Sequence, residues 1–230
     1  MYKKKSVLSL IPARSGSRRL PGKNLKMIAG IPLIAHTIEA ARRSRFVDRI
    51  VVSTESPEIA SVAVAYGAEV PFLRPKTLAE DDSSSEDVIR HAVAELGYFD
   101  YIALLQPTSP LRVSATIDGC IAKCVDRAAH SCITAYPLRH GGHKLLAMGG
   151  DSTILDRARM RISTPSPLGQ TFGAFQENGA VYLVDTKRFL DSGQILGIDS
   201  VGFEMSEWES IDIDFQSDFE AAEALLLMKK

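Results

Sequence analysis

A short segment rich in cations and small residues follows the first apolar run of the chain. Residues 12–24 read PARSGSRRLPGKN and carry four basic side chains and one amide. Backbone N–H groups of small residues can approach phosphate oxygens, and the cations can neutralise their charge. The segment is not a Walker loop, because Gly16 and Gly22 are one residue too far apart and Asn24 replaces the Ser or Thr that would hold Mg²⁺. The segment therefore predicts a nucleotide triphosphate site, with a basic surface loop as the alternative.

Two acidic residues alternate with isoleucines near the end of the chain. In the segment 210–214, SIDID, an extended backbone would place Asp212 and Asp214 on one face and the isoleucines on the other. Mg²⁺ binds one or two carboxylates together with substrate phosphates. The pair is therefore a candidate metal site, and an edge strand with a solvated acidic face is the alternative.

Two further segments carry polar side chains where loops are expected. Residues 104–112, LLQPTSPLR, form a stiff turn whose hydroxyl and amide groups suit a polyol, although a proline-braced turn alone would explain them. Residues 74–85 precede a predicted helix N-terminus, whose free N–H groups can meet an anion or a base edge. Ser83 and Glu86 form a capping box there, and ordinary helix capping is the alternative.

The composition limits the classes of protein to which the chain can belong. Its 230 residues are 45% hydrophobic and 24% charged, which is ordinary for one globular domain. The formal charge of −1 gives no reason to expect a nucleic-acid partner. The apolar run after the basic N-terminus is too short for a signal peptide or a membrane span, so we expect a cytoplasmic protein. Three cysteines predict no disulfide framework.

Apolar runs and amphipathic stretches alternate along most of the chain. Strands are expected at 7–11, 50–53, 101–105, 132–135 and 180–184, and helices at 32–43, 57–66, 83–96, about 117–125 and 215–230. This order predicts an α/β domain with a mostly parallel sheet and helices on both faces. Ligands of such sheets bind beyond the carboxyl ends of strands, where residues 12–24 fall. Residues 137–177 lack this alternation of strands and helices. We therefore expect them to form an inserted arm or lid between the two parts of one domain, 1–136 and 178–230.

Together these segments are similar to the acylneuraminate cytidylyltransferase family, which includes the CMP-sialic acid synthetases. The resemblance runs from Ile11 to about Ala222 and depends on the order and spacing of its motifs. They are IPARxxS and LPxKN within 11–24, VST at 52–54, RPxxLAxD at 74–81, LLQPTSPLR at 104–112, NGAVY at 178–182 and SIDID at 210–214.

The resemblance implies a cytidylyltransferase that moves CMP from CTP to the anomeric hydroxyl of a sialic-acid-type nonulosonic acid and uses Mg²⁺. It implies a Rossmann-like α/β domain whose arm reaches the partner's active site in a homodimer. Two rivals are a nucleotidyltransferase for another sugar acid or sugar phosphate, such as KDO, and a non-catalytic nucleotide-binding module. The SIDID ending differs from the shorter KDO enzymes.

Carried over position by position, the resemblance implies roles for the polar residues of these motifs. The triphosphate of CTP is expected at Arg14, Ser17, Lys23 and Asn24. The cytidine is expected against Arg74, Ser83 and Ser85. The sugar is expected against Gln106, Thr108, Ser109 and, on the arm, Lys144. Mg²⁺ is expected on Asp212 and Asp214, and the catalytic residues are expected to be Arg14, Lys23, Asp212 and Asp214.

One position departs from the family pattern. Sialic acid enzymes carry an Arg two residues before the Asn-Gly-Ala motif, which would pair with the sugar carboxylate. Here Gln176 occupies that sugar-binding position and Glu177 follows it. A neutral amide cannot supply a bidentate ionic clamp. The departure leaves pseudaminic, legionaminic or another related nonulosonic acid open beside N-acetylneuraminic acid.

Overall fold

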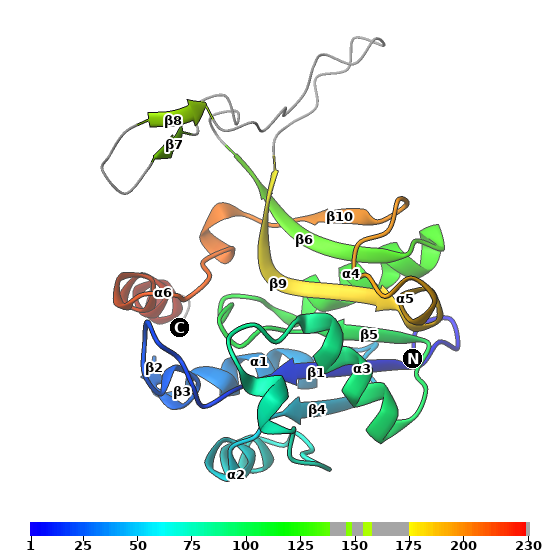
Figure 1. Ribbon diagram of the computed structural model, residues 1–230, viewed down its shortest axis with the longest axis horizontal. Helices are drawn as coiled ribbons and strands as arrows, with labels where there is room; N and C mark the ends of the chain where they lie inside the picture. Colours follow the sequence, from blue (N-terminus) through cyan, green and yellow to red (C-terminus); the bar gives the residue numbers. More distant parts are fainter. Residues whose placement is uncertain (139–145, 149–153, 158–174, 229–230) are drawn as a thin grey trace.

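A six-stranded sheet forms the centre of the computed structural model, which describes residues 1–138, 146–148, 154–157 and 175–228 (Figure 1). In spatial order its strands are β10 (Val201–Glu204), β6 (Ser131–Pro137), β9 (Phe175–Asp185), β5 (Tyr101–Leu104), β1 (Val7–Pro12) and β4 (Arg49–Ser53). Strand β1 is parallel to β4 and β5, and β10 is parallel to β6. Strand β9 is antiparallel to both β5 and β6. The predicted mostly parallel sheet is confirmed.

Helices cover both faces of this sheet (Figure 1). On one face Val7 and Ile11 of β1 pack in a cluster with α1 (Leu33–Arg42), α2 (Pro57–Ala65) and α4 (Ser114–Arg127). On the other face Leu8 and Leu10 pack with α3 (Ser85–Leu96) and α5 (Thr186–Ser192). Both sets are buried because a parallel strand in such a sheet has no solvated face. None of the described helices is long and apolar enough to cross a membrane.

A third apolar cluster joins the loops after β1 and β5 to the last helix, α6 (Gln216–Met228). Leu20, Leu111 and Ile213 come from three separate segments and pack against Phe219 of α6. A short 3-10 helix, η1 (Lys23–Leu25), and the small hairpin of β2 (Met27–Ile28) and β3 (Ile31–Pro32) follow Leu20 in the chain, and Ile28 belongs to the same cluster. This cluster holds the loops of the candidate site beside one another.

Strand β9 contains a β-bulge between Glu177 and Tyr182. Its register with β6 shifts between Ile133 and Ala135. Side chains replace the lost ladder bonds: Thr134 Oγ1 accepts a hydrogen bond from the Val181 N–H at 2.9 Å. Asn178 Oδ1 accepts one from the Ala180 N–H at 3.2 Å. A buried backbone group without such a partner would destabilise the fold, so the polar residues around the bulge are structurally required.

The segment expected to form an arm is described only in part. Strands β7 (Leu146–Met148) and β8 (Ile154–Arg157) pair antiparallel in a separate two-stranded sheet. Strands β6 and β9 extend into the segment, since Pro137 pairs with Phe175. The rest of 137–177, including the predicted sugar residue Lys144, lies outside the described residues. The division into domain and arm therefore stays a prediction.

One local prediction was wrong in detail, and the edge-strand alternative for residues 210–214 does not hold. The cap of α3 is Ser84 rather than Ser83: its hydroxyl accepts a hydrogen bond from the Asp87 N–H at 3.0 Å and donates to the Asp87 carboxylate at 2.7 Å. The sequence offers two Ser-x-x-acid pairs one residue apart, and the second is used. Ser83 instead donates to the Thr77 carbonyl at 2.9 Å. Residues 211–214 form no strand, although Ile213 is fully buried as the alternation predicts.

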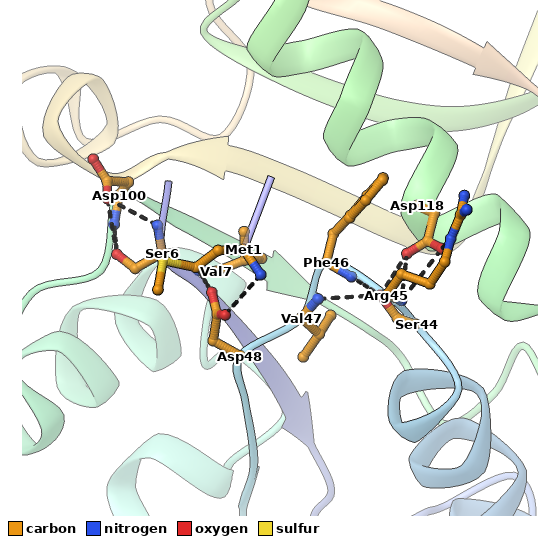
Figure 2. Close-up of polar contacts among 10 residues, drawn as sticks. All are labelled: Met1, Ser6, Val7, Ser44, Arg45, Phe46, Val47, Asp48, Asp100 and Asp118. Atoms are coloured by element: carbon orange, nitrogen blue, oxygen red, sulfur yellow. Dashed lines mark hydrogen bonds and ion pairs between the residues drawn. The ribbon is translucent and has the colours of Figure 1, made fainter. Parts of the chain in front are cut away.

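Three carboxylates bind the chain at the amino ends of the strands, opposite the loops after β1 and β5 (Figure 2). Asp48, one residue before β4, accepts a hydrogen bond from the Val7 N–H at 2.8 Å. Asp118 accepts one from the Ser44 hydroxyl at 2.6 Å. The third, Asp100, immediately precedes β5. Charged acceptors make stronger hydrogen bonds than neutral ones, so Asp48 and Asp100 fix where β1 begins, while Asp118, in α4, holds the segment before β4.

The Asp100 carboxylate binds the segment of the chain that leads into β1. Its carboxylate accepts from the Ser6 N–H at 2.9 Å, the Ser6 hydroxyl at 2.8 Å and the Lys5 ammonium at 2.9 Å. Burial alone would raise the pKa of Asp100, but these donors outweigh it and the pKa is lowered. A depressed folded-state pKa stabilises the fold above the unfolded-state pKa, and that stability is lost as the pH falls through the folded-state pKa.

We expect Asp100→Asn to lower the free energy of unfolding by about 1–3 kcal/mol near neutral pH, because an amide cannot accept all these bonds. The loss should shrink as the pH falls through the acidic range in which the wild-type carboxylate becomes protonated. Urea denaturation of both proteins across that range measures the difference. Asp126→Asn, at an exposed ion pair with Lys3, is the matched control and should have a smaller effect. An effect of Asp100→Asn that did not change with pH would contradict the assignment.

Candidate active site

Most of the predicted site residues line one open cavity of about 770 Å³. Four segments form its walls: the loop after β1, the segment before α3, the loop after β5 and the segment before α6. The predicted residues on its surface are Arg14, Ser17, Lys23, Asn24, Arg74, Ser83, Ser85, Gln106, Thr108, Asp212 and Asp214. The cationic loop and the acidic pair, far apart in the chain, therefore meet in one place.

Lys23 connects the cationic loop to the acidic segment directly. Gly22 has a left-handed backbone, with φ of 66°, and turns the chain into the 3-10 helix η1. From there the Lys23 ammonium donates a hydrogen bond to the Ile213 carbonyl and lies 3.6 Å from Asp214 Oδ1. Burial lowers the pKa of Lys23, and the Asp214 and Asp212 carboxylates oppose this shift. The Lys23 ammonium thus lies between the cationic loop and the acidic segment 212–214.

The other cations of the loop are paired with acidic side chains across the cavity. Asp81 lies 2.8 Å from an Arg14 Nη and 2.5 Å from an Arg18 Nη. Asp214 lies 2.6 Å from an Arg19 Nη. These pairs orient the guanidinium groups toward the cavity, where a polyphosphate would offer them similar oxygen acceptors. Asn24 is buried, and its amide donates a hydrogen bond to the Arg14 carbonyl at 2.9 Å. This bond stabilises the conformation of the loop.

Asp212 and Asp214 suit a divalent cation in their chemistry. Partial removal of the carboxylate from water raises the pKa of Asp212, and the nearby negative charge of Asp214 adds to this increase. A hydrogen bond from Thr108 opposes it. A hard cation would relieve this repulsion, and carboxylate oxygens are ligands that Mg²⁺ prefers. No group of three His, Cys, Asp or Glu side chains suited to a metal occurs in the described part of the chain. Two carboxylates alone would leave other positions around Mg²⁺ for substrate phosphates and water.

Arg74 is held by an acid that the sequence reasoning missed. Its guanidinium is nearly buried and lies 3.6 Å from Glu55 Oε2, while Glu55 Oε1 accepts from the N–H and hydroxyl of Ser15, both at 2.7 Å. Burial lowers the pKa of Arg74, and the Glu55 charge opposes this. Glu55 thus connects Ser15 of the cationic loop to Arg74, which is predicted to bind the cytidine. Its position directly after the VST motif was the available signal.

Gln106 lies where three neighbouring cavities meet. It lines the first cavity and also a second one of about 530 Å³ and a third of about 420 Å³. Gln176 lines the second cavity with Gln106 and Asp212, but is not among the residues of the first. Gly179 has φ of 70°, and a Cβ there would lie 2.4 Å from Gln106 Oε1. The Asn-Gly-Ala motif therefore makes space for the Gln106 amide.

The expected sugar contact at Ser109 is not supported by its position. Its side chain is fully buried, and it lines none of these three cavities. Its hydroxyl donates to the Asn178 carbonyl at 3.4 Å. Ser109 faces inward because the β9 bulge leaves that carbonyl without a strand partner, so its role here is structural.

The fold and this cavity define an α/β protein in which a cationic loop faces an acidic pair, and comparison with known sequences narrows the class. Residues 8–141 match the family model described as cytidylyltransferase, so the chain belongs to the cytidylyltransferase family. This agrees with the family predicted from the sequence motifs.

The chain spans about half the length of the first curated relatives that it matches. It is 32% identical over 216 residues to an N-acylneuraminate cytidylyltransferase of Escherichia coli, covering 94% of this chain and 51% of that protein. It is 55% identical over 119 residues to a CMP-N,N'-diacetyllegionaminic acid synthase of Legionella pneumophila, covering 48% of this chain and 50% of that protein. A solved structure of CMP:2-keto-3-deoxy-manno-octonic acid synthetase complexed with CTP shares the fold, with a TM-score of 0.72, 19% identity, and coverage of 98% and 100%.

Proposed function

We propose that this protein transfers CMP from CTP to the anomeric hydroxyl of a nonulosonic acid and releases pyrophosphate. The observation that carries the proposal is the meeting of the cationic loop and the acidic pair in one cavity, where Lys23 of the loop contacts Asp214 and the Ile213 carbonyl. Family membership and the two curated relatives support the same chemistry.

In this reaction a bond forms between the sugar oxygen and the α-phosphorus of CTP, and the bond from that phosphorus to the β-phosphate oxygen breaks. The hydroxyl proton is lost, and the electron pair leaves with pyrophosphate. Arg14 and Lys23 bind the departing phosphates and stabilise their charge. Asp212 and Asp214 would hold Mg²⁺, which when bound supplies positive charge to the phosphates and lowers the pKa of the attacking hydroxyl. The remaining contribution of the chain is alignment of the two reactants.

The second cavity supports a particular class of sugar. Its described lining includes Gln176, Glu177 and Tyr182 and contains no Arg or Lys. Such a surface accepts hydrogen bonds from hydroxyl and acylamino N–H groups, and a second acylamino group would bring one more donor to it. Together with the 55% identity to the legionaminic acid enzyme, this favours a nine-carbon acid with two acylamino groups over N-acetylneuraminic acid.

A pyrophosphate-release assay tests the proposal. We expect turnover with CTP rather than UTP, GTP or ATP, and the highest kcat/KM with an N,N'-diacetyllegionaminic-type acid in a panel that includes pseudaminic acid, N-acetylneuraminic acid and KDO. Preference for a sugar phosphate or another nucleotide would contradict it. CTP binding without pyrophosphate release for any sugar acid would indicate a non-catalytic module instead.

We also propose a cytoplasmic homodimer in which residues 137–177 contact the partner. The separate β7–β8 sheet and the extension of β6 and β9 toward it support this role. Three buried free cysteines fit a reducing compartment. Sedimentation equilibrium should give twice the chain mass of 25.1 kDa, and a monomer at assay concentration would contradict the dimer.

A further inference from the structure

Arg112 is a fully enclosed arginine without an acidic partner. Its side chain is 3% exposed, and in the described part of the chain no carboxylate lies within ion-pair distance. Burial lowers its pKa to about 9, so the guanidinium remains charged at neutral pH. Burying a charge without a counter-ion destabilises a fold unless hydrogen bonds compensate, so the contacts of Arg112 require an explanation.

The guanidinium joins three elements that lie around the cavities. One Nη donates to the Gln106 carbonyl at 3.1 Å and to the Ala180 carbonyl in the β9 bulge at 2.7 Å. The other Nη donates to Thr37 Oγ1 of α1 at 2.6 Å. The Thr37 hydroxyl also lies 3.5 Å from the Gln106 carbonyl. Through Arg112 and Thr37, the carbonyl oxygen of Gln106 is thus connected to both the β9 bulge and α1.

We propose that Arg112 is a positioning residue that fixes the Gln106 amide and the β9 bulge as one wall of the sugar-binding cavities. It acts through its neighbours, since it lines none of the three cavities itself. Gln106 lines all three, and its amide rests against Gly179, the bulge residue without a Cβ.

The geometry requires an arginine rather than a lysine or an apolar residue. A guanidinium presents several N–H groups in a fixed plane and can reach three acceptors on separate elements, whereas an ammonium is a flexible single point. An apolar side chain would leave the Ala180 carbonyl without the partner that the strand register denies it.

The proposal rests on the proposed function and is tested by the kinetics of Arg112→Met and Arg112→Lys. A small displacement of a substrate-positioning group can lower the rate about 10²-fold, and we expect Arg112→Met to reduce kcat/KM for the sugar acid by this order. The affinity for CTP alone, measured by calorimetry, should stay close to that of the wild type because the cationic loop is untouched. Arg112→Lys should recover part of the loss.

A double-mutant cycle separates positioning from general loss of structure. If Arg112 acts through Gln106, Arg112→Lys should raise the KM for the sugar acid in the wild type but have little further effect in a Gln106→Ala background. Arg188→Met is the matched control, since Arg188 also donates to a backbone carbonyl, that of Ala128 at 3.0 Å, but stands in α5. It should leave both kinetic constants unchanged.

The outcomes distinguish the two proposals. Wild-type sugar kinetics in Arg112→Met, parallel losses of CTP and sugar affinity in both variants, or additive effects in the cycle would overturn the positioning role. Wild-type protein that releases no pyrophosphate with any nonulosonic acid would instead overturn the proposed function.

Discussion

Replacing Asp212 by asparagine is expected to lower kcat about 10²-fold or more while leaving the chain folded, since this is the typical cost of losing a well-placed electrostatic group. The substitution preserves shape and removes one negative charge from the pair that would hold Mg²⁺. The fold should survive because the Asp212 side chain is solvent-accessible and its neighbour Ile213 makes the packing contacts.

Steady-state pyrophosphate release at saturating CTP, repeated over a range of Mg²⁺ concentrations, measures this effect. A weakened metal site should shift the Mg²⁺ dependence to higher concentration as well as lower kcat. Asp126→Asn changes an exposed aspartate whose partners are Lys3 and Tyr2 and serves as the control. A kcat and a Mg²⁺ dependence like those of the wild type would remove Asp212 from the mechanism.

Asp214→Asn provides an informative comparison with Asp212→Asn. Asp214 also pairs with Arg19 at 2.6 Å and with Lys23 at 3.6 Å, whereas Asp212 faces Thr108. Removing the Asp214 charge therefore changes the orientation of two cations in addition to the metal site. The two aspartates were equivalent in the sequence, and only the structure separates their surroundings.

The family resemblance, added to residue type and strand position, predicted the set of residues that line the candidate site. Loops that follow neighbouring parallel strands open at the same edge of the sheet, which explains why residues 12–24 and 106–112 lie together after β1 and β5. The alternation of acid and isoleucine in 210–214 correctly predicted that Ile213 would be buried. Residues 211–214 form no strand, yet the alternation holds, because the isoleucines pack between the loops and α6 while the aspartates point away from that cluster.

The direction of individual side chains inside a loop could not be predicted in the same way. Ser109 and Arg112 belong to the same polar turn as Gln106, yet both face inward to the β9 bulge. That bulge arises from a register shift between β6 and β9, strands separated by 37 residues in the chain, so no local pattern reveals it. Glu55 was missed for a related reason: its partners Ser15 and Arg74 are distant in sequence.

Lys23→Met is expected to lower kcat/KM for CTP about 10²-fold, because it removes the charge that we propose binds the phosphates and a donor to the Ile213 carbonyl. Lys23→Arg keeps a cation and should retain much more activity, and Lys187→Met in α5 changes an exposed lysine as the control. Burial lowers the pKa of Lys23. Its charged form is therefore lost earlier on the alkaline side than that of an ordinary lysine.

This shift gives the Lys23 variants a distinctive pH dependence. In the wild type, kcat/KM for CTP should fall on the alkaline side as Lys23 loses its proton, since this ratio reports groups of the free enzyme. Lys23→Arg should move that decline to higher pH, because a guanidinium stays protonated. Lys23→Met should have low activity at every pH and lack the same decline. If the alkaline decline were identical in the wild type and Lys23→Arg, the group that titrates there would not be Lys23, and the triphosphate contact would have to come from the arginines of the loop.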